Sequence, residues 1–293
     1  MKIGLQIPSF TWPGGPAEIG ARLAEIGHTA DEAGFDSLWV MDHFFQISFV
    51  GKPEEPMLEG YSALSFLAAV TKRVTLGTLV TGVIYRHPGI LAKTVTTLDV
   101  LAGGRAWLGI GAAWNEEESQ GLGVPFPPLR DRFEQLEEAL QIVHQMWRGD
   151  ERPYAGKHYQ LARPLNSPQA IRRPHPPIMI GGTGEQKTLR MVAQYADACN
   201  LFDRMGAEVL THKLDVLKGH CETLGRPFEE IEVTTLGTAM LLPGKQTPAD
   251  LVAHCKGLAA LGVQHAIFNM PNVTDPEALK TFGREVIPAV AEL

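Results

Sequence analysis

The sequence predicts an α/β protein, a (β/α)8 TIM barrel with an insertion over the C-terminal mouth of the barrel. Short β-branched, apolar segments alternate strictly with longer segments of helical periodicity, and there are eight of each. The 293 residues, 44% of them hydrophobic, fit one barrel of about 250 residues plus an insertion better than two domains. Alternating units also build open doubly wound sheets, but eight is the number that a closed barrel requires.

The first four units lie before residue 148. The predicted strands cover residues 3–7, 36–41, 74–80 and 106–110, and the predicted helices cover 17–33, 60–70, 88–101 and 130–147. Gly34 ends the first helix, Pro88 begins the third, and Gly103 and Gly104 stop it. The helix 60–70 is apolar on nearly every side, which a solvent-facing helix is not, so we expect it to lie in a homodimer interface.

The remaining four units follow an irregular segment. The predicted strands cover residues 178–180, 198–202, 231–236 and 264–269, and the helices 185–196, 207–224, 248–261 and about 275–286. Residues 149–177 contain six prolines and follow neither period. We therefore expect a single domain over 1–293, with an insertion at about 149–177 that covers the mouth as a lid.

Composition restricts the partners and the compartment. A net charge of -7 argues against nucleic acid or an acidic membrane as partner, so the ligand is expected to be a small-molecule substrate. The three cysteines show no CxxC spacing and are expected to be reduced, packed thiols of a cytoplasmic protein. No apolar run approaches the ~20 residues of a membrane span, and no signal peptide is evident.

Several common motifs are absent. Residues 109–114 do not satisfy GxGxxG, and the chain has no GxxxxGK[ST], HExxH or GxSxG sequence. The ten histidines include no pair at a spacing typical of zinc ligands, so no metal site is expected.

Two positive signals remain, both after predicted strands. The sequence GGTGE at 181–185 places three glycines and Thr183 where a strand ends and a helix begins, which favours a phosphate cradle over a plain tight turn. Asp42 and His43 follow the second strand, where an imidazole can exchange a proton near neutral pH. Adjacent strand residues point to opposite faces, so Asp42 need not touch the ring, and both residues have a capping role as the alternative.

The chain resembles the bacterial luciferase-like monooxygenase family in four segments taken together. These are IGLQIP, GFDSLWVMDHF, the long segment from VTLGTLVTGVIYRHP to WNEEE, and RPHPPIMIGGTGEQ. Within that family the chain is similar to the branch that uses the deazaflavin coenzyme F420, over essentially its whole length. The resemblance implies a homodimeric barrel oxidoreductase whose flavin-like ring lies at the barrel mouth.

The resemblance also implies roles for individual residues. His43 would give or take the proton, and a cis peptide between the non-proline residues Leu79 and Val80 would support the ring from behind. Asn115 would contact the ring, and Gly181 and Gly182 would meet the phosphate. The full set expected to bind the cofactor is Asp42, His43, Leu79, Val80, Asn115, Ile180, Gly181, Gly182 and Thr183, with His43 and Asp42 as the catalytic pair.

The chain departs from the sugar-phosphate dehydrogenases of this branch. Those enzymes have a glutamate near the position of Trp114. They also have a tryptophan shortly after the histidine, whereas the residues after His43 in this chain, 44–47, are FFQI. Sugar-phosphate oxidation is therefore not expected. Trp114 would stack on a ring or wall off the substrate cavity, or else simply pack above the barrel. Glu116, Glu117 and Glu118 are expected to complement a helix start, without a catalytic role.

The expected reaction is hydride transfer between reduced F420 and an unsaturated small organic substrate, with His43 handling the proton. Lys187 and Arg190 would meet the acidic tail of the coenzyme or be solvated helix residues. One alternative is an FMN-dependent two-component monooxygenase supplied by a separate cofactor reductase. Another is a non-catalytic flavin- or deazaflavin-binding protein. A phosphate-sugar isomerase or aldolase would need a catalytic Lys or Glu at a strand end, and none is convincingly placed.

Overall fold

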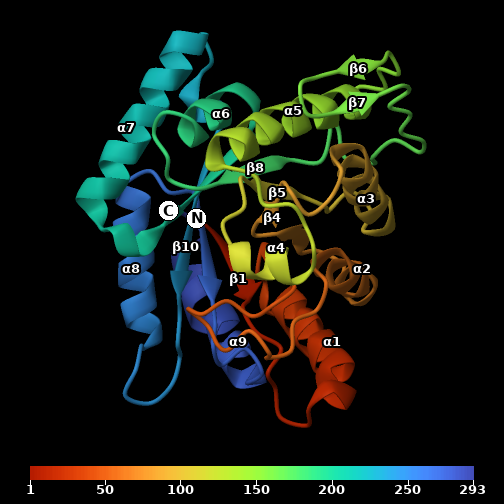
Figure 1. Cartoon of the computed structure of the whole chain (residues 1–293). Helices are drawn as coiled ribbons and strands as arrows, with labels where there is room; N and C mark the ends of the chain where they lie inside the picture. The colour runs from red at the N-terminus through yellow and green to blue at the C-terminus, as the bar shows by residue number, and fades with distance from the viewer.

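The computed structural model describes all residues, 1–293, as a parallel barrel surrounded by helices, which confirms the predicted fold class (Figure 1). The sheet order is β3-β2-β1-β11-β10-β9-β8-β5-β4, and every neighbouring pair in it is parallel. Leu76 of β3 forms a parallel bridge with Ala106, before β5, and this bridge closes the ring.

The sheet has nine strand segments but eight barrel positions, because β3 and β4 are two parts of one strand interrupted at residues 79 and 80. The strands are β1 Lys2–Ile7, β2 Ser37–Val40, β3 Thr75–Thr78, β4 Thr81–Gly82, β5 Leu108–Gly111, β8 Ile178–Gly181, β9 Ala198–Phe202, β10 Glu232–Thr238 and β11 His265–Asn269. All eight predicted strands are present, with shifted ends.

Eight helical segments follow these strands, one after each barrel position. They are α1 Pro16–Ala33, α2 Gly60–Val70, α3 Pro88–Leu101, α4 Glu116–Gly121 with α5 Leu129–Trp147, α6 Thr188–Tyr195, α7 Ala207–Leu224, α8 Pro248–Ala260, and α9 Pro276–Thr281 continued by a π-turn into α10 Ile287–Val290. Gly34 and Gly225 cap α1 and α7 in the left-handed conformation, and Gly34 is the residue predicted to end the first helix.

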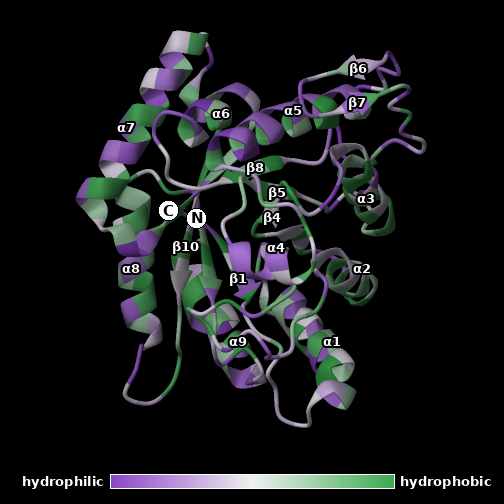
Figure 2. Ribbon diagram, in the orientation of Figure 1, coloured by the Kyte–Doolittle hydropathy of each residue, from purple (hydrophilic) through white to green (hydrophobic).

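Apolar side chains occupy two layers. A cluster of 64 buried residues fills the space between strands and helices. A second cluster lies inside the barrel and consists of Trp39, Leu79, Trp107, Met179, Ala198 and Ile267. Gly77 makes room for this interior, since a Cβ there would lie 2.5 Å from the Trp39 ring. Figure 2 shows β5 and β8 as mostly hydrophobic, whereas α1 and α7 carry both kinds of residue.

A chain of polar groups closes the amino-terminal end of the barrel. The Trp39 indole N–H donates to Ser37 Oγ at 2.7 Å, and that hydroxyl is 2.9 Å from His265 Nε2. His265 Nδ1 lies 3.0 Å from the Glu232 carboxylate, which also pairs with Lys2 at 2.8 Å. Burial would raise the pKa of Glu232, but His265 and Lys2 prevail and lower that pKa to about 2.

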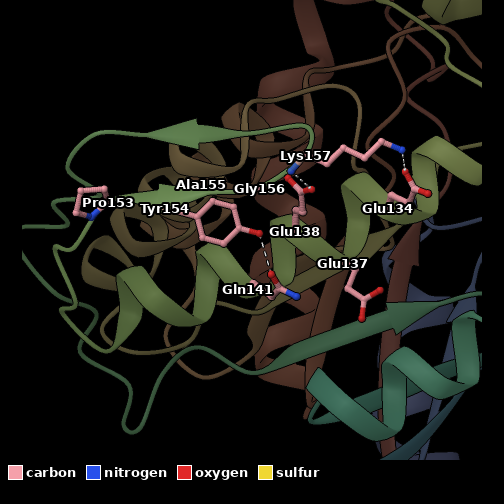
Figure 3. A pocket seen from close by; sticks show the side chains of 9 residues that line it. All are labelled: Glu134, Glu137, Glu138, Gln141, Pro153, Tyr154, Ala155, Gly156 and Lys157. Atoms are coloured by element: carbon pink, nitrogen blue, oxygen red, sulfur yellow. Dashed lines mark hydrogen bonds and ion pairs between the residues drawn. The ribbon is translucent and has the colours of Figure 1, made fainter.

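The insertion lies beside the outer helices and not across the strand ends, which corrects the expected lid. Its hairpin, β6 Tyr154–Ala155 and β7 Gln160–Leu161, runs along α5, where Glu138 accepts the backbone N–H groups of residues 157–159 (Figure 3). Further on, Asp99 of α3 accepts the N–H groups of Ile171 and Arg172. Proline-rich sequence indicates an insertion but not the face of the barrel that the insertion covers. The Glu138 and Asp99 carboxylates fix its position, because they accept its backbone N–H groups.

The cysteines Cys199, Cys221 and Cys255 are free and buried, as expected of packed thiols. No helix combines the length and the apolar character that crossing a bilayer requires.

Candidate active site at the carboxyl edge of the barrel

The residues predicted to form the site lie at one end of the barrel. Because all barrel strands are parallel, the loops after β2, β4, β5 and β8 emerge at the same rim. His43 follows β2, Asn115 follows β5, and the glycine turn begins at the last residue of β8. His43 and the expected anion site therefore share one mouth.

His43 is held by the carboxylate of Glu118 and not by that of its neighbour Asp42. Its Nδ1 lies 2.6 Å from Glu118 Oε1, and the imidazole is 12% exposed while the carboxylate is fully buried. An ionised carboxylate only accepts hydrogen bonds, so the Nδ1–H donates to Glu118. The other ring nitrogen, Nε2, is left as the atom that can exchange a proton.

Glu118 accepts hydrogen bonds from two loops, the one after β2 and the one after β4. Its Oε2 accepts the backbone N–H groups of Phe44 at 2.8 Å and Phe45 at 3.2 Å, and Tyr85 donates its hydroxyl to Oε1. Burial would raise the pKa of Glu118, but hydrogen bonds from His43, Tyr85 and the Phe45 amide outweigh it and lower the pKa. The expectation that Glu118 only complements a helix start is thus wrong. It orients His43.

Asp42 does not contact the His43 ring but forms a bidentate pair with Arg86. The guanidinium donates at 2.6 and 3.0 Å, and it also pairs with Glu59. Arg86 lies 4.6 Å above the centroid of the Tyr61 ring, a cation–π contact. Burial raises the pKa of the Asp42 carboxyl, and the Arg86 guanidinium opposes that rise. Asp42 therefore secures the loop that carries His43.

The predicted cis peptide between Leu79 and Val80 is present. The Leu79 N–H donates to Val40 O at 2.8 Å, and Gln6 donates to Leu79 O at 3.3 Å. The Val80 side chain faces two strand ends, since a Cβ at Gly181 or Gly111 would lie 3.0 or 3.1 Å from its methyl carbons. Val80 thus links the interrupted strand to the glycine turn.

The glycine turn presents free backbone donors. The Gly182 N–H donates to Asn200 O at 3.4 Å. The N–H groups of residues 183–187 donate to no acceptor in the chain. Helix α6 begins at Thr188, three residues later than predicted, so residues 185–187 extend the turn. Thr188 lies against it, with Oγ1 3.0 Å from a Cβ built at Gly184. Consecutive unpaired amides before a helix form an anion-binding concavity.

The other predicted residues differ in what they offer. Asn115 is the N-cap residue of α4 but its side chain makes no capping hydrogen bond, so its amide is free. The Ile180 side chain is fully buried in the outer core layer, which leaves only its backbone facing the turn. Arg190 pairs with Glu137 at 3.2 Å, and Lys187 lies over the Phe133 ring, so both have partners within the chain.

Trp114 does not pack above the barrel as a buried side chain. It is 52% exposed and meets the His43 ring edge to face, with centroids 5.4 Å apart. No group of three or more His, Cys, Asp or Glu side chains is arranged to hold a metal ion.

Four residues of the site could not be recognised from the sequence alone: Glu118, Tyr85, Arg86 and Glu59. Tyr85 and Arg86 lie in the loop after β4, at the same rim as His43, so their position was a usable signal. Glu118 is one of three consecutive glutamates, and the sequence does not indicate which of the three is buried. In the folded chain Glu116 and Glu117 are exposed and Glu118 is buried.

Comparisons with known proteins identify the family. A model described as luciferase-like monooxygenase matches residues 1–272, so the chain belongs to that family. An F420-dependent glucose-6-phosphate dehydrogenase from Kineococcus radiotolerans is 36% identical over 91% of this chain and 92% of its own. One of the same name from Nakamurella multipartita is 31% identical over 74% of this chain and 62% of that relative.

Solved structures agree on the fold. An F420-dependent secondary alcohol dehydrogenase, in complex with an F420-acetone adduct, has a TM-score of 0.80 at 19% identity, covering 99% of both chains. The oxygenating constituent of 3,6-diketocamphane monooxygenase from Pseudomonas putida, in complex with FMN, has a TM-score of 0.76 at 17% identity, covering 98% of both. At these identities the likeness concerns the fold alone.

Proposed function

We propose that this chain is an oxidoreductase that uses coenzyme F420 to exchange a hydride with an unsaturated small organic substrate. The observation that carries the proposal is the near full-length similarity to an F420-dependent dehydrogenase. The site supports it, because a histidine held by a carboxylate and a turn of free amides lie at the same mouth.

The chain's own residues fit the coenzyme. The amides of residues 183–187 and the Thr183 hydroxyl would hold the phosphate of the side arm. The wall formed by Leu79 and Val80 would support one face of the ring, and the free Asn115 amide would contact its polar edge. When bound, the deazaflavin supplies the hydride chemistry that no protein side chain offers.

His43 handles the proton at Nε2. With Nδ1–H donated to Glu118, a neutral His43 presents a lone pair at Nε2 that accepts a proton when the substrate is oxidised. The resulting imidazolium is stabilised by the buried Glu118 carboxylate at 2.6 Å, and it returns the proton when the substrate is reduced. The same dyad therefore serves either direction of hydride flow.

The substrate is proposed not to be a sugar phosphate. The exposed indole of Trp114 stands beside His43, where the sugar-phosphate enzymes are expected to have a glutamate.

A cofactor titration tests the proposal. Oxidised and reduced F420 and FMN are each titrated into the purified protein while cofactor fluorescence is recorded. The proposal expects binding of F420 and at least tenfold weaker binding of FMN. Micromolar affinity for FMN without a response to F420 would instead support the two-component monooxygenase, which needs a separate reductase.

His43→Ala separates an enzyme from a non-catalytic carrier. The variant is expected to keep its F420 affinity and to lose turnover of enone substrates about 10²- to 10⁴-fold, the usual contribution of a positioned acid or base. Unchanged turnover with the cofactor bound would remove His43 from the reaction.

We further propose a cytoplasmic homodimer joined through α2 and α3. Large apolar side chains project from these two helices into solvent: Phe66 is 41%, Ile90 63% and Leu101 64% exposed. Such a surface is typical of an interface between subunits. Light scattering should give twice the 32.0 kDa mass of the chain, and Ile90→Asp should shift it toward the monomer.

A further inference from the structure

Two exposed aromatic side chains stand beside the candidate proton-transfer histidine. Trp114 is 52% exposed and Phe49 is 79% exposed, and their ring centroids are 6.1 Å apart. Trp114 in turn contacts the His43 ring edge to face at 5.4 Å. Exposed apolar side chains that contact one another, and are not scattered singly, mark candidate ligand-binding surfaces.

The backbone holds both aromatic residues in place. Ala113, directly before Trp114, has a φ of 63°, a left-handed conformation that a non-glycine residue rarely adopts. Phe49 lies in a turn whose Val50 and Gly51 N–H groups both donate to Ile47 O, at 2.9 and 3.0 Å. Trp114 and Phe49 therefore lie on separate loops, and the backbone of each loop has a defined conformation.

We propose that Trp114 and Phe49 form an aromatic wall that binds a planar, apolar part of the substrate next to His43. The inference rests on the proposed function and deepens it, because it assigns the substrate class. Aromatic rings attract flat π-systems by stacking and by edge contacts. The preferred substrates are aryl-substituted enones or related conjugated carbonyl compounds.

Binding of two non-reactive probes tests the wall without turnover. Naphthalene-2-carboxamide and cyclohexanecarboxamide share one polar group but differ in planarity. Calorimetry should show the planar amide binding at least tenfold more tightly to the wild-type protein. Trp114→Ala should weaken the planar amide about tenfold and the other less than twofold. Phe49→Ala should cause a smaller loss, and Trp114→Phe should restore most of the affinity.

Leu224→Ala is the matched control. Leu224 is a 46% exposed apolar residue at the carboxyl end of α7, at the opposite end of the barrel from His43. This variant should bind both probes like the wild-type protein.

Kinetics provide a second readout. With 4-phenylbut-3-en-2-one, Trp114→Ala should raise KM about tenfold and leave kcat nearly unchanged, while but-3-en-2-one should show little change in either. Equal losses for both enones or both probes would overturn the wall. So would a tenfold loss of F420 affinity, since Trp114 would then contact the coenzyme. If the wild-type protein binds no F420, the proposed function fails, and the probe amides alone decide the inference.

Discussion

The imidazole of His43 and the carboxylate of Glu118, 75 residues apart in the chain, are joined by a 2.6 Å hydrogen bond inside the barrel mouth. That carboxylate also accepts hydrogen bonds from two backbone N–H groups and from the Tyr85 hydroxyl. Glu118 is thus a positioning residue, because it fixes the tautomer and orientation of the ring and stabilises its charged form.

Glu118→Gln should lower kcat/KM about 10²-fold and leave F420 affinity unchanged. The side-chain amide of this variant has no negative charge with which to stabilise the imidazolium, so proton exchange at Nε2 becomes harder. The measurement is the pH profile of kcat/KM, because a change confined to stability would leave the position of that profile unmoved.

Glu117→Gln is the control for this variant, since Glu117 is the exposed neighbour on the same helix turn. It should behave like the wild-type protein. A Glu118→Gln enzyme within twofold of wild type over the whole pH range would remove the positioning role.

Thr183→Val should weaken F420 binding about tenfold, as expected for the loss of one hydrogen bond to a charged group. The side chain keeps its shape and loses only its hydroxyl, and Thr183→Ser should restore the affinity. A deazaflavin without the phosphorylated side arm is the comparison ligand. If its affinity falls by the same factor, Thr183 does not meet the phosphate.

Arg86→Met should destabilise the protein by about 3–5 kcal/mol, because it leaves the Asp42 carboxylate buried without its partner. Burial then raises the pKa of Asp42 unopposed, so the variant should recover stability as the pH falls and the carboxyl takes up its proton. Urea unfolding at two pH values measures both effects, with the exposed Arg73→Met as control. A loss below about 1 kcal/mol would show that the pair contributes little.

Glu232→Gln should reduce stability at neutral pH by on the order of 3 kcal/mol, the equivalent of a pKa lowered from 4.5 to about 2. A carboxyl whose pKa is lower in the folded state stabilises the fold above its ordinary pKa. This contribution is lost as the pH falls from 4.5 toward 2. Melting temperatures of variant and wild type should therefore converge in acid. A constant difference, or the same effect from the exposed Glu229→Gln, would contradict the assignment.

The barrel could be predicted from the sequence because its signals are local. Periodicity, Pro88 and Gly34 mark where elements begin and end, and eight alternating units leave few topologies. The cis peptide at Leu79 and Val80 came from the resemblance alone, because no local pattern distinguishes it from a continuous strand.

Most contacts within the site could not be predicted this way. The adjacency of Asp42 and His43 left open whether the carboxylate touches the ring. The partner of each residue comes from a distant loop, since Arg86 pairs with Asp42 and Glu118 with His43. The position of the insertion likewise depends on Glu138 and Asp99, two carboxylates of outer helices that accept its backbone N–H groups.

The most direct test of the central claim is a crystal structure of the protein with F420 bound. We expect the side-arm phosphate on the amides after Gly182 and the ring against Val80, with its reactive carbon facing His43 Nε2. A phosphate bound elsewhere, or a ring on the far side of the mouth from His43, would contradict it.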